Sequence, residues 1–160
     1  MASPSPEPAP QPARASPGAA SGRMRKQKVR DTGPELALRR ELHGRGLRYF
    51  VHRRPLPGLR READIVFPRA KVAVFVDGCW WHGCPDGHGG LASTNGAFWS
   101  DKIDANRVRD ADTDERLAAQ GWTSVRVWEH ESASLAACEV ERAVRARSGP
   151  RAGRRQDQDG

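Results

Sequence analysis

The sequence predicts an α/β domain in which a mixed β-sheet is flanked by helices. An almost unbroken β-branched run at residues 71–76 is typical of a central strand that is buried on both faces. Shorter strand-like segments precede and follow this run. Helical patterns stand at both ends of the chain and between the last two strands. The expected order is therefore α-β-β-β-α-β-α, in which helices cover the faces of one sheet.

The folded domain is expected to span residues 24–147 of a chain of 160 residues, which is enough for one core. Residues 1–23 consist mainly of Pro, Ala, Ser and Gly, so a disordered arm is expected there. Residues 148–160 predict a disordered basic tail for the same reason. No stretch approaches the ~18 apolar residues that cross a bilayer, and no targeting signal is recognisable.

The first helix is expected to begin at a capping box in residues 32–35, with Pro34 in its first turn. Leucines recur at helical spacing after it, and Gly44 and Gly46 end the pattern. A long helix is expected from about Gly96 to Gln120, and a last helix from about Ser132 to Arg147. Cys138 lies among apolar residues of the last helix and is expected to be a core cysteine.

Four segments have the composition of strands. The first lies at residues 49–51 and the second at 63–67, with a Pro-Leu-Pro-Gly turn between them. The third is the run at 71–76, and the fourth alternates apolar and polar residues at 124–128. Residues 78–95, rich in Gly, Cys and His, are expected to form a loop.

The chain is strongly basic, with a formal net charge of +7. Arginines and lysines gather in residues 23–30 and 142–155, which favours a polyanionic partner, with nucleic acid before an acidic membrane. The alternative is a solvated basic surface with no partner. Three cysteines, an odd and low number, indicate a reducing, cytoplasmic compartment.

Cysteines and histidines gather around the end of the third strand. If the third and fourth strands are neighbours, their ends bring His130 beside Cys79, with Cys84 and His88 nearby in the sequence. Two thiolates and two imidazoles suit a tetrahedral structural zinc, and the loop has few apolar residues to stabilise it otherwise. The alternative is a pair of buried thiols and two surface histidines, because the spacing matches no common zinc finger.

Acidic residues lie at the ends of two buried strands. Asp64 opens the second strand and Asp77 ends the third, and oxygen ligands of this kind suit Mg²⁺. A turn aspartate paired with Arg60 or Arg61 is the alternative for Asp64. His82 lies near the point where the two acids should converge and is a candidate general base.

One stripe of the long helix is apolar at both ends and polar in its middle, where Asn106 and Asp110 lie. Such residues either form hydrogen bonds with a neighbouring strand, or they indicate that the helix passes under an active site. The adjacent Trp80 and Trp81 cannot both pack into one core face and are expected to stack on bases or to wedge between them. Alternatively, one covers the end of the sheet and the other shields the zinc.

Five blocks of the sequence resemble very short patch repair endonucleases. They lie in the family's order over residues 24–131, and they read RDTGPE at 30–35, VDGCWWHGCP at 76–85, FWSDKI at 98–103, NRVRD at 106–110, and GW with VWEH at 121–130. The resemblance implies a restriction-endonuclease-like fold with a structural zinc. It also implies a Mg²⁺-dependent endonuclease that nicks DNA 5′ to the thymine of a T:G mismatch left by 5-methylcytosine deamination.

The resemblance assigns catalytic roles residue by residue. Asp64 matches the main Mg²⁺-binding aspartate, and Val76 matches a position whose backbone carbonyl helps to hold that metal. His82 matches the general base, while Asp110 and Glu35 match acids near the active site. The two-carboxylate-plus-lysine set of the wider nuclease superfamily is absent after the third strand, and His82 serves in its place.

The resemblance also implies contacts with DNA. Trp80 and Trp81 match an aromatic pair that intercalates beside the mismatch, and Lys102 and Asn106 match positions close to the mismatched base. Asp77 stands where some members carry histidine. The implied partner is double-stranded DNA with a T:G mismatch, bound by a monomer at the nucleoid in the cytoplasm. Other mismatch repair proteins are further candidate partners, whereas a membrane is not.

The rival to an endonuclease is a non-catalytic, zinc-stabilised module that recognises distorted duplex DNA. An RNA-binding adaptor fits only the charge and the aromatic residues. Asp64 and His82 discriminate between these classes, because a binding module needs neither a metal-binding carboxylate nor a general base.

Overall fold

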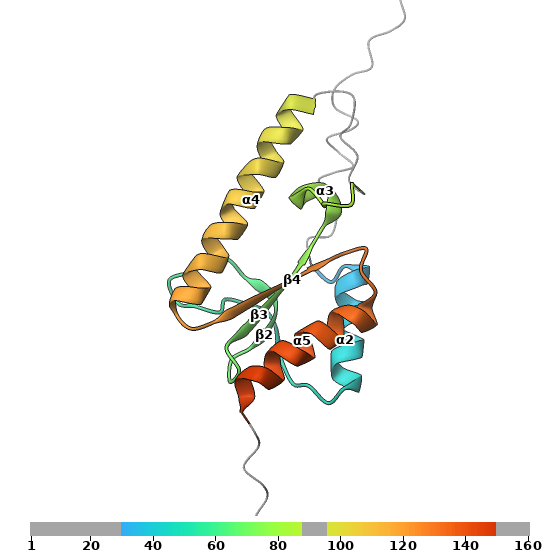
Figure 1. Cartoon of the computed structure of the whole chain (residues 1–160), viewed down its shortest axis with the longest axis vertical. Helices are drawn as coiled ribbons and strands as arrows, with labels where there is room; N and C mark the ends of the chain where they lie inside the picture. The colour runs from blue at the N-terminus through green and yellow to red at the C-terminus, as the bar shows by residue number, and fades with distance from the viewer. Residues whose placement is uncertain (1–29, 88–95, 150–160) are drawn as a thin grey trace, which may run out of the picture.

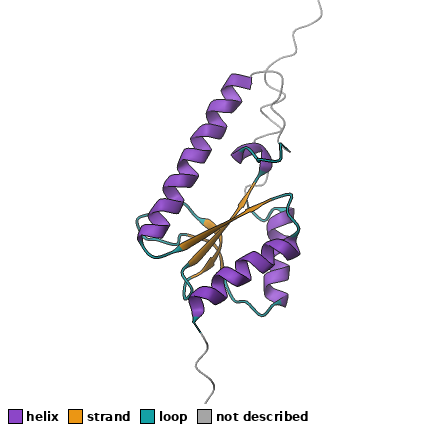
Figure 2. Ribbon diagram, in the orientation of Figure 1, coloured by secondary structure: helices purple, strands orange, loops and turns teal. Residues whose placement is uncertain are grey.

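A computed structural model of the chain describes residues 30–87 and 96–149. The arm predicted for residues 1–23 and most of the predicted tail lie outside these residues. Within them, one β-sheet has helices on both of its faces (Figure 1, Figure 2). The structure therefore confirms the predicted mixed sheet flanked by helices.

The sheet has four strands in the order β1-β2-β3-β4. β1 and β2 are antiparallel, β2 and β3 are antiparallel, and β3 and β4 are parallel. Because parallel strands end at the same edge, the carboxyl ends of β3 and β4 meet, and Asp77 is the register partner of Trp128. The strands are β1 (Phe50–Arg53), β2 (Ala63–Phe67), β3 (Val72–Asp77) and β4 (Thr123–Trp128).

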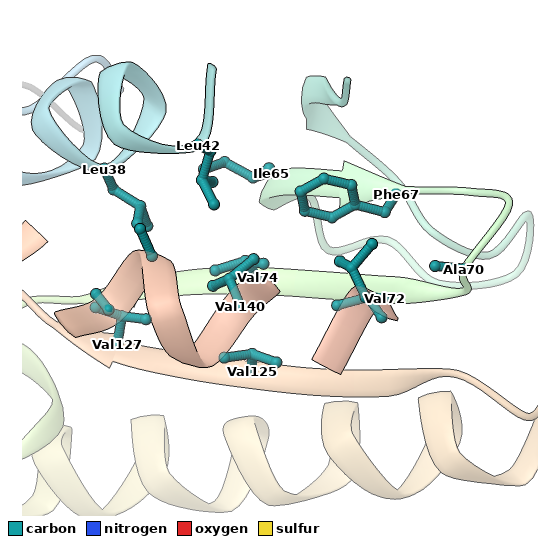
Figure 3. Close-up of a cluster of buried hydrophobic side chains, with 13 residues drawn as sticks. Leu38, Leu42, Ile65, Phe67, Ala70, Val72, Val74, Val125, Val127 and Val140 are labelled. Atoms are coloured by element: carbon teal, nitrogen blue, oxygen red, sulfur yellow. The ribbon is translucent and has the colours of Figure 1, made fainter. Parts of the chain in front are cut away.

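One face of the sheet is covered by α2 (Gly33–Gly44) and α5 (Ala133–Ser148). Leu38 and Leu42 of α2 and Val140 of α5 are fully buried against β-branched residues of the strands (Figure 3). Burial of each such side chain contributes about 1.5–3 kcal/mol. The strand residues of this core are Ile65, Phe67, Val72, Val74, Val125 and Val127.

The other face is covered by the carboxyl-terminal half of α4 (Gly96–Ala119), where Leu117 packs on the same core as Phe75. The amino-terminal half of α4 extends beyond the sheet and runs beside the short helix α3 (Cys79–His82), as Figure 1 shows. None of the described helices combines the length and the apolar composition that crossing a bilayer requires.

Two local predictions were wrong in their details. Thr32 is the N-cap of α2, but its side chain makes no capping hydrogen bond, and the Glu35 side chain bonds Arg39 and does not close the box. Residues 79–82, predicted as loop, form α3. Its start is held by the N–H of Cys79, which donates to the Glu129 carboxylate at 2.8 Å.

Cys138 is exposed, not buried in the core as predicted. The buried stripe of α5 runs through Ala136, Ala137 and Val140, and Cys138 falls on the adjacent side of the helix. Its sulfur lies 3.2 Å from Nη1 of Arg45, which links α2 to α5.

Candidate active site

A cavity of about 280 Å³ opens on the α4 face of the sheet. Asp64 of β2 and Arg126 of β4 line it, together with Asp77, His82 and Asp110. Alternate residues of a strand face the same side, so the side chains of residues 64, 75 and 126 form a row across three strands. The structure thus collects in one pocket the acids and the histidine that the sequence placed at the ends of two strands, in a loop and in the middle of the long helix.

Asp64 is a partly buried carboxylate at the start of β2. Its Oδ2 accepts a hydrogen bond from the backbone N–H of Val76 at 2.7 Å, and no described residue hydrogen-bonds its other oxygen. Burial, with smaller contributions from the negative charges of Glu35 and Asp77, raises the pKa of Asp64 to about 6, and the hydrogen bond from Val76 and the charge of His52 only partly oppose this rise. The alternative, in which Asp64 pairs with Arg60 or Arg61, is not seen: the carboxylate accepts its hydrogen bond from the neighbouring strand.

His82 and Asp110 form a close pair. Nδ1 of His82 lies 2.6 Å from Oδ2 of Asp110. An ionised carboxylate can only accept a hydrogen bond, so Nδ1 carries the proton and donates. Nε2 is then the basic nitrogen, and no described residue hydrogen-bonds it. This arrangement orients an imidazole to take a proton from a reactant, as a general base requires.

The position of His82 depends on tight docking of α3 on α4. Gly83 ends α3 with φ 63°, and a Cβ at this residue would lie 2.7 Å from Cγ2 of Ile103 and 2.6 Å from Nη2 of Arg107. Glycine is required both for the left-handed backbone and for the close approach. Nδ2 of Asn106 donates to the Trp81 carbonyl at 2.7 Å and holds the same two helices together.

Asp77 is buried, and both of its oxygens are bonded to Arg126, at 3.1 and 2.9 Å from Nη1. Burial raises the pKa of Asp77, and the attraction of Arg126 only partly offsets this effect. Sequence reasoning paired Asp77 with Asp64 as metal ligands and did not find Arg126. The available signal was an arginine among the alternating apolar residues of the fourth strand.

Glu35 is 2% exposed and forms an ion pair with Arg39. Nε2 of His52 lies 3.3 Å from Oε1 of Glu35, and His52 has a φ of 48°, which is uncommon for a strand residue other than glycine. Glu35 acts on Asp64 through its charge, which contributes to the raised pKa of that carboxyl. Arg39 and His52, which sequence reasoning missed, keep this buried acid paired.

A second cluster lies beside the pocket, where β3 and β4 end. The donor atoms of Cys79, Cys84 and His130 all lie within 4.8 Å of one another. Nδ1 of His130 is 2.9 Å from Sγ of Cys79 and 3.7 Å from Sγ of Cys84. Tetrahedral zinc separates such donors by about 3.6 Å, so the three residues fit that metal. His88, the fourth predicted ligand, lies outside the described residues.

Metal content tests this cluster. Burial raises the pKa of the Cys79 thiol to about 11, so this thiol is protonated at neutral pH and a metal must displace its proton. We expect purified protein to hold about one zinc per chain and Cys79→Ser to lose most of it and to unfold more easily. Cys138→Ser, which changes an exposed cysteine, is the matched control. Less than about half an equivalent in the folded wild type would refute the site.

The aromatic residues gather at the protruding end of α4. The rings of Trp80 and Trp81 both meet Trp99 edge-on, with centroids 5.9 and 6.0 Å away. Phe98 packs on Trp99 at 5.5 Å and is 54% exposed. Nζ of Lys102 lies 5.0 Å from the centre of the Phe98 ring. The result is a partly exposed aromatic cluster with a cation beside it, next to the pocket.

Comparison with known proteins identifies the family of the chain. The family model described as DNA mismatch endonuclease Vsr matches residues 15–85. Type II nicking enzyme V.XorIIP of Xanthomonas oryzae pv. oryzae is 41% identical over 127 residues, which cover 79% of this chain and 91% of that protein. Type II nicking enzyme V.NaeI of Lentzea aerocolonigenes is 45% identical over 114 residues, covering 69% and 68%.

A further relative carries the family's own description. The DNA mismatch endonuclease Vsr of Escherichia coli (strain K12) is 35% identical over 109 residues, which cover 68% of each chain. A binding module without catalysis is excluded by these matches, because their members are nucleases that hydrolyse DNA. The chain belongs to the Vsr family of DNA endonucleases.

Proposed function

We propose that this endonuclease nicks duplex DNA 5′ to the thymine of a T:G mismatch by Mg²⁺-dependent hydrolysis. The observation that carries the hydrolytic part of the proposal is one pocket that Asp64 and the bonded His82–Asp110 pair line together. The four-stranded mixed sheet supports the restriction-endonuclease-like fold that the family resemblance implies. The enzyme would act as a monomer at the nucleoid, with other mismatch repair proteins as candidate partners.

Asp64 and the backbone carbonyl of Val76 would hold Mg²⁺. The donor set fits a hard cation, because Mg²⁺ takes one or two protein oxygens and keeps several waters. Asp64 has one oxygen that no described residue hydrogen-bonds, and the Val76 backbone is directly beside it. When bound, the metal would stabilise the negative charge that develops on the phosphate oxygens.

His82 would accept a proton from the attacking water at Nε2. Asp110 orients the ring through Nδ1 and stabilises the imidazolium that forms. Hydrolysis of the phosphodiester would leave a 5′-phosphate and a 3′-hydroxyl. Glu35 would support the site from behind Asp64, where its charge is already paired with Arg39.

The aromatic cluster would distort the duplex beside the pocket. Trp80 and Trp81 would insert between bases, with Trp99 bracing both rings. Unstacking costs a few kcal/mol per step and costs least at a mispair, so insertion favours the mismatch before any base edge is read. Lys102 would lie near the mismatched base, whereas Asn106 would act by holding Trp81 in place.

A second candidate function is nicking at a fixed sequence in fully paired DNA. Two relatives with more than 40% identity are described as type II nicking enzymes, and that description does not mention a mismatch. The two functions differ in whether a mispair is required. The pocket residues discussed above serve either one.

Nicking assays on matched duplexes distinguish these functions. Labelled duplexes that carry T:G, C:G or T:A at one position are incubated with wild-type protein and Mg²⁺, with Asp64→Ala as the inactive control. We expect one nick, 5′ to the mispaired thymine, at a rate about 100-fold or more above that of the paired duplexes. Equal nicking of C:G and T:G duplexes would support the fixed-sequence function. The same assay without Mg²⁺ tests the metal requirement, and nicking is expected to be lost.

A further inference from the structure

Arg126 lines the pocket from β4, the strand that pairs in parallel with β3. It is the register partner of Phe75, and its guanidinium carbon lies 4.8 Å from the centre of that ring. Three carboxylates surround the guanidinium, one from β3 and two from α4, and they are those of Asp77, Asp110 and Asp114. An arginine in such a place can either bind a DNA phosphate or organise the acids around it.

The hydrogen-bond donors of Arg126 are occupied by the chain itself. Nη1 donates to both oxygens of Asp77 at 3.1 and 2.9 Å. Nε and Nη2 donate to Asp114 at 2.9 and 3.2 Å, and Nη2 also donates to the backbone carbonyl of Asp110 at 3.3 Å. All three nitrogens of the guanidinium fork are therefore engaged. A DNA phosphate would have to displace one of these acids.

Two of the acids face the same nitrogen of His82. Oδ2 of Asp110 lies 2.6 Å from Nδ1 of His82, and Oδ1 of Asp77 lies 3.9 Å from the same atom. Arg126 engages both oxygens of Asp77, and its Nη2 lies 3.5 Å from the remaining oxygen of Asp110. The arginine thus keeps Asp77 on itself and leaves Asp110 as the acceptor for His82.

We propose that Arg126 is a positioning residue of the nuclease site, which binds Asp77, Asp110 and Asp114 together so that Asp110, and not Asp77, accepts the hydrogen bond from His82. This inference rests on the proposed role of His82 as the general base. Alignment of His82 sets the direction of Nε2, and small displacements of a catalytic group reduce rates strongly. Arg126 itself touches neither the reacting phosphate nor the water.

Arg126→Met and Arg126→Lys test the proposal, with Arg45→Met as the control. Arg45 is buried to a similar degree, with 24% of its side chain exposed against 21% for Arg126, and it bonds Glu141 on the opposite face of the sheet. We expect the single-turnover nicking rate of Arg126→Met to fall about 10- to 100-fold, with the Kd for DNA unchanged. Arg45→Met should change neither quantity.

Arg126→Lys keeps a positive charge beside the buried Asp77, so the test does not depend on the folding of the Met variant. A lysine ammonium cannot bind three acids in one plane, and we expect a loss of about tenfold in rate. The ¹⁵N chemical shifts of the His82 ring report its tautomer and do not depend on how stable each variant is. They should show protonated Nδ1 in the wild type and in Arg45→Met, and a mixture of tautomers in the Arg126 variants.

Wild-type rates and an unchanged His82 signal in both Arg126 variants would overturn the inference. So would a weaker Kd for DNA with an unchanged rate, which would make Arg126 a phosphate ligand. His82→Ala, measured in parallel, separates the two proposals. An active His82→Ala refutes the general base, and the inference falls with it. An inactive His82→Ala with unaffected Arg126 variants refutes the positioning role alone.

Discussion

Asp64→Asn is expected to abolish nicking while it stabilises the folded chain above pH 6. The loss of a metal-binding carboxylate should lower the nicking rate about 1,000-fold or more. Asparagine is nearly isosteric, and its Oδ1 can still accept the hydrogen bond from the N–H of Val76. The change therefore removes one negative charge from the pocket with little change in its shape.

The expected gain in stability follows from the sign of the pKa shift. Burial raises the pKa of Asp64 from 3.8 to about 6, so the native state disfavours the ionised carboxylate more than the unfolded state does. Asp64 contributes fully to stability below pH 3.8, and that contribution is lost as the pH rises through 6. Above pH 6, the free energy of unfolding of Asp64→Asn should exceed that of the wild type by about 2–3 kcal/mol.

Denaturant titrations without Mg²⁺, repeated across this pH range, measure the difference. Glu41→Gln, which changes a partly exposed acid on α2, is the control and should alter neither the nicking rate nor the pH dependence. Nicking by Asp64→Asn within about tenfold of the wild type would refute the metal-binding role. An Asn variant that is less stable than the wild type at every pH would refute the argument from burial.

His82→Ala is expected to lower the single-turnover nicking rate about 1,000-fold, near the upper range for a general base. Asp110→Asn should cost about 100-fold or more, because an amide can donate to Nδ1 and thereby favour the tautomer with a proton on Nε2. That tautomer cannot accept a proton from water. DNA binding should be unchanged in both variants, since neither side chain is assigned to the duplex.

The two changes should not be additive. Asp110 acts through His82, to which it is bonded at 2.6 Å, so the double variant should be no slower than His82→Ala alone. His43→Ala, at an exposed histidine of α2, is the control and should keep the wild-type rate. Losses that multiply in the double variant would show that Asp110 has a separate role. Retention of zinc by His82→Ala would show that the cluster of Cys79 is intact.

Much of the fold could be predicted because local patterns and burial agree along the chain. The β-branched run of the third strand predicted a central position, and β3 lies between β2 and β4. The prediction that the ends of the third and fourth strands meet also holds, with Asp77 opposite Trp128. Cys138 was assigned to the core from its apolar neighbours, although a shift of one residue around a helix turns a side chain by about 100°.

The loop after β3 could not be predicted in the same way. Its polar and aromatic residues have no periodicity, and α3 forms because Glu129, 50 residues later, accepts the N–H of Cys79. Docking on α4 through Gly83 and Asn106 completes it. The rings of Trp80 and Trp81 both reach Trp99 for the same reason, since the position of α4 is set by packing against the sheet.

The four strands, the three longer helices, the acids at the ends of the buried strands and the likeness to a nuclease family could all be predicted from the sequence alone. These properties depend on short stretches whose residues lie close together along the chain. Only the three-dimensional structure shows which group each acid bonds. Asp64 bonds the Val76 backbone, Asp110 bonds His82, and Asp77 bonds Arg126. Such pairs depend on strand register and on the angle at which α4 crosses the sheet, and residues far apart in the chain settle both.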